Sequence, residues 1–444
     1  MTWVLPSTQR RTYLIIRLVI DSYDVCSTEA KPSTIEQSLY SSLLSNYTTE
    51  ILPRCNHTTN ITVNLDIALR EIIALNEREQ TLKLKMWIRQ SWKDCGLAWT
   101  PATYGGLTSF SVSMGKLWTP DITLFESAHE GENMPGRGFY RITVYSDGSA
   151  YFNFPTVVEM SCSVDVTYFP YDTQKCTITL GSWTYNGQEV DLVARRSTGD
   201  LSSFVKSNEW EVISFRSERH VLYYGCCPEP FPDVTFYLQM KRKPKFYVLT
   251  IIFPCTLVLA LAALGFIIPA DSGEKVSLEV TVLLSLSVFL LLVSDKLPAS
   301  AETFPIIGVY FSVCMIIVCL SCTFAVWVLY LHFRGESTSP VPSWVRRLFL
   351  GKLRFILCPT TKVGFVDKKP GMGKNKDDVK VENIDSLSVC DGSQETGTHD
   401  DMGAEERLEE WRALARVLDR LFFIFYMVIS PTVTIVFFGI LVNQ

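Results

Sequence analysis

Four long apolar segments constrain the fold of this chain more than any other feature of its sequence. Three of them carry no charged side chain, and the segment Val276–Ser294 carries only Glu279. Each is long enough to cross a bilayer as a helix, which takes about 20 residues. One such run could be a buried core helix, but four indicate a membrane protein. We expect spans at 246–270, 276–294, 304–331 and 421–442.

The long segment before the first span has features of an extracellular domain. Three glycosylation sequons lie close together, and we expect glycans at Asn46, Asn56 and Asn60. Disulfides are permitted on that side of the membrane. The pairing of Cys26, Cys55 and Cys95 stays open. Residues 1–26 place basic residues before an apolar stretch, as a signal peptide does, although Arg17 interrupts that stretch and the cleavage site stays open.

The same segment predicts a helix followed by many strands. Apolar spacing over Ile35–Ile51 is helical, and from about Ile61 to Met240 short segments alternate with period two between turn signals. Many short strands in succession are typical of an all-β sandwich or barrel. We expect an extracellular β-sandwich with an N-terminal helix over residues 27–245, followed by a four-helix transmembrane domain.

Residues 334–420, between the third and fourth spans, have the composition of a short, partly disordered cytoplasmic loop. The segment 342–358 is basic and amphipathic, which is typical of a helix on a membrane surface. Residues 361–403 are polar and predict disorder, and residues 405–420 predict a helix that runs into the fourth span. The basic clusters indicate a cytoplasmic location. With four spans, both termini are then extracellular.

The second span carries hydroxyl and small aliphatic side chains at helical spacing. Successive members are four, three, four, three and four residues apart, so they share one stripe, which we call the pore stripe. The pore stripe consists of Ser277, Thr281, Leu284, Val288, Leu291 and Asp295. A helix that is polar at its ends and apolar between them suits a water-filled pore with a hydrophobic gate. Small residues that pack helices together would give a similar pattern.

Acidic residues bound this helix at both ends. If several chains each contribute one copy, Glu274 and Asp295 form rings of negative charge, which favour cations. Glu279 lies about 200° around the helix from the pore stripe and should face away from it. An acid at that depth needs a partner or a proton, and the sequence does not identify the partner.

Several motifs together resemble a known family. They are Cys162-SVDVTYFPYDTQK-Cys176, TLGSWTYNG at 179–187, YYGCCPEPFPD at 223–233 and PADSGEKVSLEVTVLLSLSVFLLL at 269–292. Over nearly its whole length the chain resembles the Cys-loop receptors, the pentameric ligand-gated ion channels, and within them the alpha-type subunits of nicotinic acetylcholine receptors. The resemblance implies a disulfide between Cys162 and Cys176. It also implies a bridge between Cys226 and Cys227 in a loop that closes over the agonist.

The resemblance also implies an agonist site between two extracellular domains, caged by aromatic rings. Ring faces attract a quaternary ammonium group, more strongly when it is desolvated. The principal-face positions are Phe125, Trp183, Tyr224 and Phe231, and the complementary-face positions are Trp87, Tyr151 and Asn153. Any one of these rings could instead be a core residue of a strand.

Three residues depart from the pattern of this family. Phe125 and Phe231 stand where agonist-binding nicotinic subunits usually have tyrosines. Thr179 replaces the lysine of a polar triad whose other members are Tyr224 and Asp233. The identity of the agonist therefore stays open, as do subunit composition and calcium permeability.

The residues that couple ligand binding to channel opening in this family are also present. The resemblance implies a buried ion pair between the extracellular and membrane domains, with a loop tip and a proline beside it. The positions are Glu77, Arg242, Phe169, Pro170, Asp172 and Pro298. The alternative for Glu77 and Arg242 is two solvated surface charges.

The sequence argues against several other functions. The net charge of −5 does not suggest a nucleic-acid partner. The five histidines are scattered without metal spacing, and Cys226–Cys227 lacks the second cysteine pair of a zinc site. We therefore expect no enzyme activity, no metal and no cofactor. An anion channel of this family would normally have a Pro-Ala-Arg-like sequence where this chain has Gly273-Glu274-Lys275.

We expect a cation-selective, ligand-gated channel subunit in the plasma membrane, and the resemblance implies a postsynaptic location. Its partners would be further copies or related subunits in a pentamer, a small cationic ligand such as acetylcholine, permeant cations and membrane lipid. One alternative is an orphan or obligately heteromeric subunit that is gated by another amine or an amphiphile. The other is a ligand-binding homologue that does not conduct.

Overall fold

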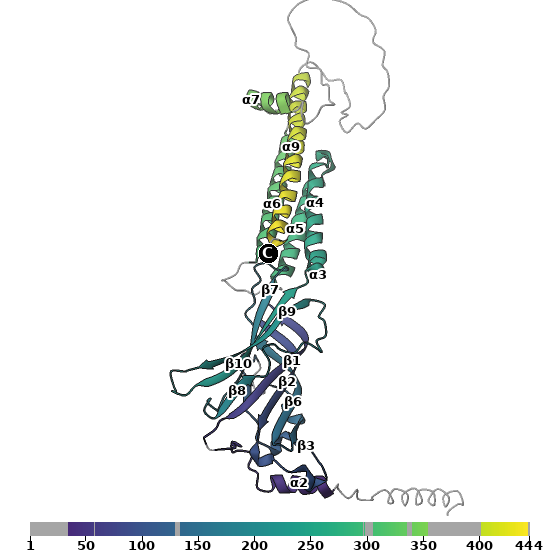
Figure 1. Cartoon of the computed structure of the whole chain (residues 1–444). Coiled ribbons are helices and arrows are strands. Elements are labelled where there is room, and N and C mark those ends of the chain that lie inside the picture. The colour runs from purple at the N-terminus through teal and green to yellow at the C-terminus, as the bar shows by residue number, and fades with distance from the viewer. Residues whose placement is uncertain are drawn as a thin grey trace, which may run out of the picture.

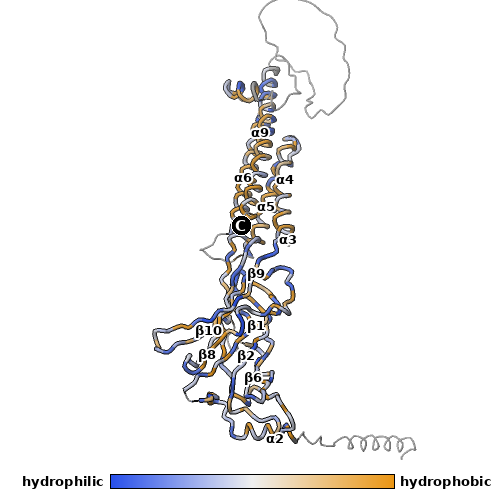
Figure 2. Tube along the Cα trace, viewed as in Figure 1, coloured by the Kyte–Doolittle hydropathy of each residue, from blue (hydrophilic) through white to orange (hydrophobic). Residues whose placement is uncertain are grey.

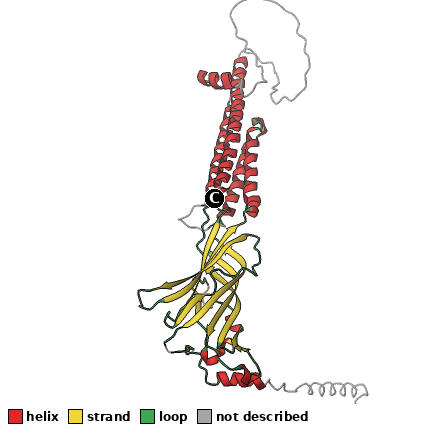
Figure 3. Cartoon of the chain, viewed as in Figure 1, coloured by secondary structure: helices red, strands yellow, loops and turns green. Residues whose placement is uncertain are grey.

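The chain is elongated, with a β-sandwich at one end and a bundle of long helices at the other (Figures 1 and 3). The structure is a computed structural model that describes residues 34–56, 58–128, 134–295, 297, 305–334, 340–353 and 401–442. The predicted signal peptide (1–26), Cys26 and Pro298 lie outside these residues. So does most of the segment predicted as disordered, but its last three residues, 401–403, belong to helix α9.

Two sheets form the sandwich, which confirms the predicted fold class. The six-stranded sheet has the order β3-β5-β6-β2-β1-β8, and the four-stranded sheet has the order β4-β7-β10-β9. Neighbouring strands are antiparallel except for β1 and β8, which are parallel. The strands are β1 (Ile61–Asn76), β2 (Thr81–Lys93), β3 (Ser109–Ser113), β4 (Ile122–Leu124), β5 (Arg141–Tyr145), β6 (Ser149–Ser161), β7 (Thr173–Ser182), β8 (Val190–Ala194), β9 (Trp210–Leu222) and β10 (Phe231–Arg242).

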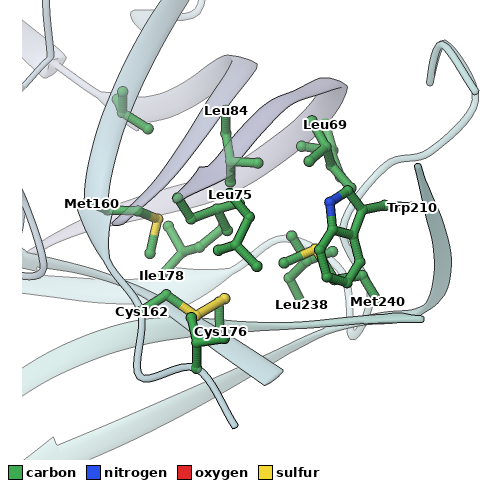
Figure 4. Close-up of a cluster of buried hydrophobic side chains, with 14 of the residues drawn as sticks. Leu69, Leu75, Leu84, Met160, Cys162, Cys176, Ile178, Trp210, Leu238 and Met240 are labelled. Atoms are coloured by element: carbon green, nitrogen blue, oxygen red, sulfur yellow. A yellow bond between two sulfur atoms is a disulfide. The ribbon is translucent and has the colours of Figure 1, made fainter. Parts of the chain in front are cut away.

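The alternating pattern of the strands directs their apolar side chains into one core. In β2, Leu82, Leu84, Met86 and Ile88 are buried, and the residues between them face outward. Successive side chains of a strand point to opposite faces of the sheet, so every second residue lines the core. The disulfide between Cys162 and Cys176 lies against this core (Figure 4).

Helix α2 (Thr34–Leu44) covers the far end of the sandwich and is shorter than the helix predicted over Ile35–Ile51. The apolar spacing continued past Leu44 because Tyr47, beyond the helix, also packs against the core. Tyr47 follows the helix, and its hydroxyl donates a hydrogen bond of 2.7 Å to Asp94. Burial raises the pKa of the Asp94 carboxyl, while this hydrogen bond lowers it.

A disulfide between Cys55 and Cys95 ties the segment after α2 to the end of β2, a pairing that the sequence left open. The short 3-10 helices of the extracellular domain are η2 (Cys95–Leu97), η3 (Pro101–Tyr104), η4 (Met114–Lys116) and η5 (Arg137–Phe139).

Four helices in the described residues are long and apolar enough to cross a membrane, which confirms the predicted four-helix domain (Figure 2). The first spans Lys245–Phe266 and is built from α3 (Lys245–Tyr247), the π-helical turn η6 (Val248–Ile252), α4 (Phe253–Ala262) and η7 (Ala263–Phe266). After the 3-10 turn η8 (Ala270–Ser272) come α5 (Lys275–Ser294), α6 (Ile306–His332) and α9 (Asp401–Val442).

Helix α9 joins two predicted elements into one continuous helix, because residues 405–420 and the fourth span share an unbroken helical backbone. The predicted amphipathic helix is described over 343–353, as α7 (Ser343–Val345) and η9 (Arg346–Leu353). The C-terminal end of α9 lies beside the sandwich end of the bundle (Figure 1).

Candidate ligand-binding faces and pore-lining helix

Four aromatic residues gather at one end of the four-stranded sheet. Phe125 directly follows β4, Trp183 directly follows β7, and Phe231 begins β10. Asp233 pairs with Gly181, so extending that register by two residues sets Trp183 opposite Phe231. Trp183 is 77% exposed and Tyr224 is 48% exposed, which is unusual for large rings. The sequence-predicted principal face is therefore an exposed aromatic surface in the single chain.

Local contacts fix the loop that carries Trp183. The Asp121 carboxylate accepts hydrogen bonds from the Ser182 hydroxyl at 2.5 Å and from the backbone N–H of Thr184 at 2.7 Å. The ring of Phe125 lies against Gly181, where an added Cβ would come within 2.3 Å of Phe125 Cζ. Only glycine leaves room for that ring.

The hairpin between β9 and β10 carries the adjacent cysteines. Cys226 and Cys227 are joined by a disulfide, and the ring of Tyr224 lies 5.5 Å from that of Phe231 at an edge-to-face angle. In Figure 1 this hairpin extends away from the body of the sandwich.

The polar triad expected from the resemblance is replaced by a different cluster. Within the described residues, Asp233 contacts His220, with 3.0 Å between Oδ1 and Nδ1, and accepts a hydrogen bond of 3.0 Å from Thr235. The hydroxyl oxygens of Thr235 and Thr179 lie 3.3 Å apart, so the Thr179 hydroxyl can donate to that of Thr235. Tyr224 makes its ring contact with Phe231 instead of joining Asp233. The replacement of lysine by Thr179 leaves room for an uncharged hydroxyl chain here.

The predicted complementary-face residues share the outer face of the six-stranded sheet. Asn153 on β6 pairs with Arg89 on β2, and Tyr151 pairs with Ser91, two positions along the strand from Arg89. Trp87 lies two positions before Arg89 on β2, on the same face, and is partly buried. The two predicted faces therefore lie on different sheets, and one chain does not bring them together.

Arginines surround Trp87, a feature that the sequence analysis did not identify. The guanidinium carbon of Arg70 lies 4.5 Å from the centroid of the Trp87 ring, and that of Arg89 lies 5.9 Å away. Arg89 also donates hydrogen bonds to Asp66 at 3.1 Å and to Asp200 at 2.7 Å. Burial alone would lower the pKa of Arg89, but these carboxylates raise it above its usual value.

A buried charge cluster lies at the end of β10, where the sandwich meets the helices. The Arg242 side chain is fully buried, and its nitrogens lie 2.7 Å from Glu77, 2.8 Å from Asp172 and 3.0 Å from Glu209. Its guanidinium also covers the Trp210 ring at 4.3 Å. The sequence predicted one ion pair here, but the arginine meets three carboxylates.

The loop closed by Cys162 and Cys176 contacts the membrane helices directly. The Phe169 ring lies 4.9 Å from that of Tyr247 on the first membrane helix, and Pro170 beside it is buried. The backbone N–H of Ile306, the first residue of α6, donates a hydrogen bond of 3.0 Å to the carbonyl of Thr167 in this loop. These contacts connect the sandwich to two membrane helices.

Helix α5 has one exposed face and one buried face. Every member of the pore stripe is exposed in the single chain, and so is Glu274 at its start. The opposite face buries Lys275, Glu279, Val282, Leu286 and Val293. The pore stripe is therefore the side of α5 that its own bundle leaves uncovered.

The buried face of α5 also holds its two ionisable side chains. Glu279 accepts a hydrogen bond of 2.9 Å from Ser321 on α6, which supplies the partner that the sequence left unidentified. Gly265 faces the same carboxyl group, where an added Cβ would come within 2.3 Å of Glu279 Oε1. Lys275 forms a salt bridge with Asp419 on α9, so its charge is neutralised away from the pore stripe.

Comparison with known proteins identifies the family. Residues 36–244 match the family profile of the neurotransmitter-gated ion-channel ligand binding domain, and residues 251–403 match that of the neurotransmitter-gated ion-channel transmembrane region. The chain belongs to the neurotransmitter-gated ion-channel family. The order of the two profiles matches the order of sandwich and membrane helices in the structure.

Relatives of this channel subunit include neuronal acetylcholine receptor subunits. The alpha-10 subunit of Homo sapiens is 42% identical over 320 residues, covering 72% of this chain and 70% of the relative. The alpha-10 subunit of Rattus norvegicus is 36% identical over 411 residues, covering 87% and 89%. The alpha-9 subunit of Gallus gallus is 39% identical over 338 residues, covering 76% and 69%. These matches confirm the predicted resemblance to nicotinic alpha-type subunits, and the chain is a ligand-gated channel subunit of that type.

The three predicted glycosylation sites of this channel subunit lie on its surface. Asn46, Asn56 and Asn60 are all exposed. No cluster of three or more His, Cys, Asp or Glu side chains that could hold a metal ion occurs in the part of the chain that the structure describes. The sequence analysis missed His220, Glu209 and Asp419 because each is distant in sequence from the residue that it contacts.

Proposed function

We propose that this chain is a subunit of a pentameric, cation-selective channel that opens when a small cationic ligand binds between extracellular domains. The exposed pore stripe of α5, with acids at both ends, carries this proposal. Each subunit would contribute one copy of α5 to the pore wall, in line with the closed cyclic symmetry of most soluble homo-oligomers.

The charges around the cytoplasmic end of α5 favour cations. Glu274 and Asp271 are exposed there, whereas Lys275 is buried and paired with Asp419. The lysine next to the acidic ring therefore does not cancel the negative charge that a permeant ion meets. Rings of carboxylates attract cations and repel anions. At the other end of the helix, Asp295 is exposed and adds a second ring.

The middle of the pore stripe supports a hydrophobic gate. Leu284, Val288 and Leu291 are 65%, 49% and 66% exposed in the single chain, although all three are large apolar residues. A ring of such side chains excludes water when it is narrow, and it conducts when it widens. The hydroxyls of Ser277 and Thr281 would wet the pore below it.

The ligand would occupy an aromatic cage between two chains. Trp183, Tyr224, Phe125 and Phe231 would come from one subunit, and Trp87, Tyr151 and Asn153 from its neighbour. Exposed rings on the first surface support this, because a quaternary ammonium binds ring faces best once water is excluded. The names of the relatives suggest acetylcholine as the ligand. The loss of two tyrosine hydroxyls at Phe125 and Phe231 allows a different amine.

Movement of the capping hairpin would pass to the pore through the Arg242 cluster and the loop of Cys162 and Cys176. Both contact the membrane helices, and α6 contacts the buried face of α5, opposite the pore stripe. We further propose a plasma-membrane location with both termini outside, glycans at the three exposed asparagines and a postsynaptic role. The receptor would not act as an enzyme.

The direct test is voltage clamp on cells that express this chain alone, with surface labelling to verify delivery. Acetylcholine, choline, nicotine and a panel of monoamines would be perfused. We expect an agonist-evoked current, and we expect Trp183→Ala to lose it while Tyr40→Ala, at an exposed ring on α2, retains it. Surface protein without current to any agonist would contradict a homomeric receptor and favour the orphan or heteromeric alternative.

A further inference from the structure

The Arg70 side chain covers the ring of Trp87, a residue of the complementary face of the proposed ligand site. Strand β1 has a register irregularity between Leu69 and Glu71, and Arg70 lies at it. Its guanidinium carbon is 4.5 Å from the centroid of the Trp87 ring. This is a cation–π contact, the same interaction by which an aromatic cage binds an ammonium ligand.

The backbone holds Arg70 in this position. Its carbonyl accepts a hydrogen bond of 2.8 Å from the backbone N–H of Val205, and Leu69 donates one of 3.0 Å to the carbonyl of Asp200. Asp200 in turn donates through its N–H to the carbonyl of Ile67 at 2.8 Å. The segment after β8 therefore anchors β1 at Ile67, Leu69 and Arg70.

The two arginines beside Trp87 differ in how their charge is balanced. Arg89 is hydrogen-bonded to Asp66 and Asp200, so its guanidinium is committed to two carboxylates. Among the described residues, Arg70 forms no salt bridge with a carboxylate, and its guanidinium lies against the Trp87 ring. The donors of Arg70 are consequently available to a ligand that reaches this face.

We propose that Arg70 is a specificity-determining residue of the complementary face, selecting ligands that carry a carboxylate or another strong hydrogen-bond acceptor opposite their ammonium group. This inference rests on the proposed function, because it requires Trp87 to face the ligand. A bare cation would have to displace Arg70 from the ring and approach a like charge. A zwitterion can place its ammonium group in the principal cage and its carboxylate on the guanidinium, whose planar fork matches a carboxylate with two parallel hydrogen bonds.

Two probes that differ in one end separate these effects. Tetramethylammonium has the cation alone, and 4-(trimethylammonio)butanoate adds a carboxylate on a short chain. Binding would be measured by calorimetry on the full-length assembly in detergent, and current by voltage clamp, for the wild type and Arg70→Gln. Arg216→Gln, at an exposed arginine on β9 of the other sheet, is the matched control.

We expect Arg70→Gln to strengthen tetramethylammonium binding by about tenfold and to weaken zwitterion binding by about tenfold, while Arg216→Gln changes neither. Arg70→Lys keeps the charge but loses the planar fork. It should leave tetramethylammonium binding unchanged and still weaken the zwitterion, and it serves as the second variant if Arg70→Gln does not reach the surface.

Two results would overturn the inference. If Arg70→Gln leaves both affinities within twofold of the wild type, Arg70 only covers an exposed ring. If it weakens tetramethylammonium, Arg70 supports the cation site instead of opposing it. In both cases the wild type would still respond to agonist, so the proposed function would stand. Absence of binding and of current in every variant would overturn the proposed function and this inference together.

Discussion

In the sandwich, apolar side chains alternate between a buried core and a polar surface, whereas in the membrane helices most apolar side chains face outward. Between 11% and 33% of the residues in the four apolar windows are buried within the chain. In β2, by contrast, alternate positions are almost fully buried. Each half therefore has an outer surface suited to a different environment, water for the first and lipid or neighbouring helices for the second.

This difference changes what an exposed residue means. An exposed ring such as Trp183 is unusual on a water-facing domain and indicates a binding surface. An exposed leucine on a membrane helix carries no such information, since lipid, a neighbouring subunit or a pore could all cover it. On α5, the hydroxyls and acids in line with Leu284 distinguish the pore stripe from a lipid-facing surface.

The junction between the halves combines both kinds of environment. Arg242 is buried with three carboxylates at the base of the sandwich, next to the first membrane helix. Burial alone would lower the pKa of this arginine, but hydrogen bonds and charge from Asp172, with the charge of Glu77, raise it above its usual value. The arginine is therefore charged at any physiological pH.

The largest effect on protein stability and delivery is expected for a substitution at this junction. Arg242→Gln removes the only cation of the cluster and leaves the carboxylate charges of Asp172 and Glu77 uncompensated in a mostly buried site, which costs about 3–5 kcal/mol. We expect little or no protein at the cell surface by antibody labelling, whereas Arg216→Gln, at an exposed position, should be delivered normally. Normal delivery of Arg242→Gln with wild-type currents would mean that the cluster holds neither the fold nor the coupling.

The same substitution, made once on each face of α5, distinguishes the roles of the two faces. Leu284→Thr places a hydroxyl in the proposed gate, so we expect leak current and agonist sensitivity raised roughly tenfold, equivalent to about 1.4 kcal/mol. Leu286→Thr places the hydroxyl in the buried face, where it should lower thermal stability without producing leak. Voltage clamp and heat denaturation in detergent distinguish the two. Leak from Leu286→Thr but not from Leu284→Thr would reverse the assignment of the faces.

The contact of Gly265 with Glu279 can be tested by a double-mutant cycle. Gly265→Ala should destabilise the protein by about 1–3 kcal/mol, because its Cβ would overlap the Glu279 carboxyl group. In the Glu279→Ala background the same change should cost much less, and heat denaturation in detergent measures both. Equal costs in the two backgrounds would show that the two residues do not compete for space.

The smallest effect is expected at Asp200, which accepts a hydrogen bond from Arg89. Hydrogen bonds from Ser202, together with Arg89, hold the pKa of this carboxyl below its usual range. A depressed pKa stabilises the folded state above the pKa of the unfolded group, about 3.9, and the contribution fades as pH falls toward the folded pKa. We expect Asp200→Asn to lower the melting temperature of the protein slightly at pH 7 and less at pH 3. If the melting temperature of Asp200→Asn fell further below that of the wild type as the pH was lowered, the result would contradict this expectation.

Much of this architecture could be predicted from the sequence, and the failures have physical causes. Period-two alternation identified the sandwich because burial there depends on position within one strand. The spans were predictable because a bilayer requires about 20 apolar residues. The α2 boundary was wrong because Tyr47, in the segment after the helix, also packs on the core. Arg70, His220 and Asp419 were missed because their partners are brought near only by sheet register or helix packing.

The central claim is that α5 lines a cation-selective pore, and the reversal potential of the agonist-evoked current tests it most directly. External sodium chloride would be diluted tenfold under voltage clamp, for the wild type and for Glu274→Gln. The account predicts that the wild-type reversal potential moves to more negative voltage, toward the new sodium equilibrium potential, and that Glu274→Gln moves less. A shift to more positive voltage would mean that chloride carries the current and would contradict the account.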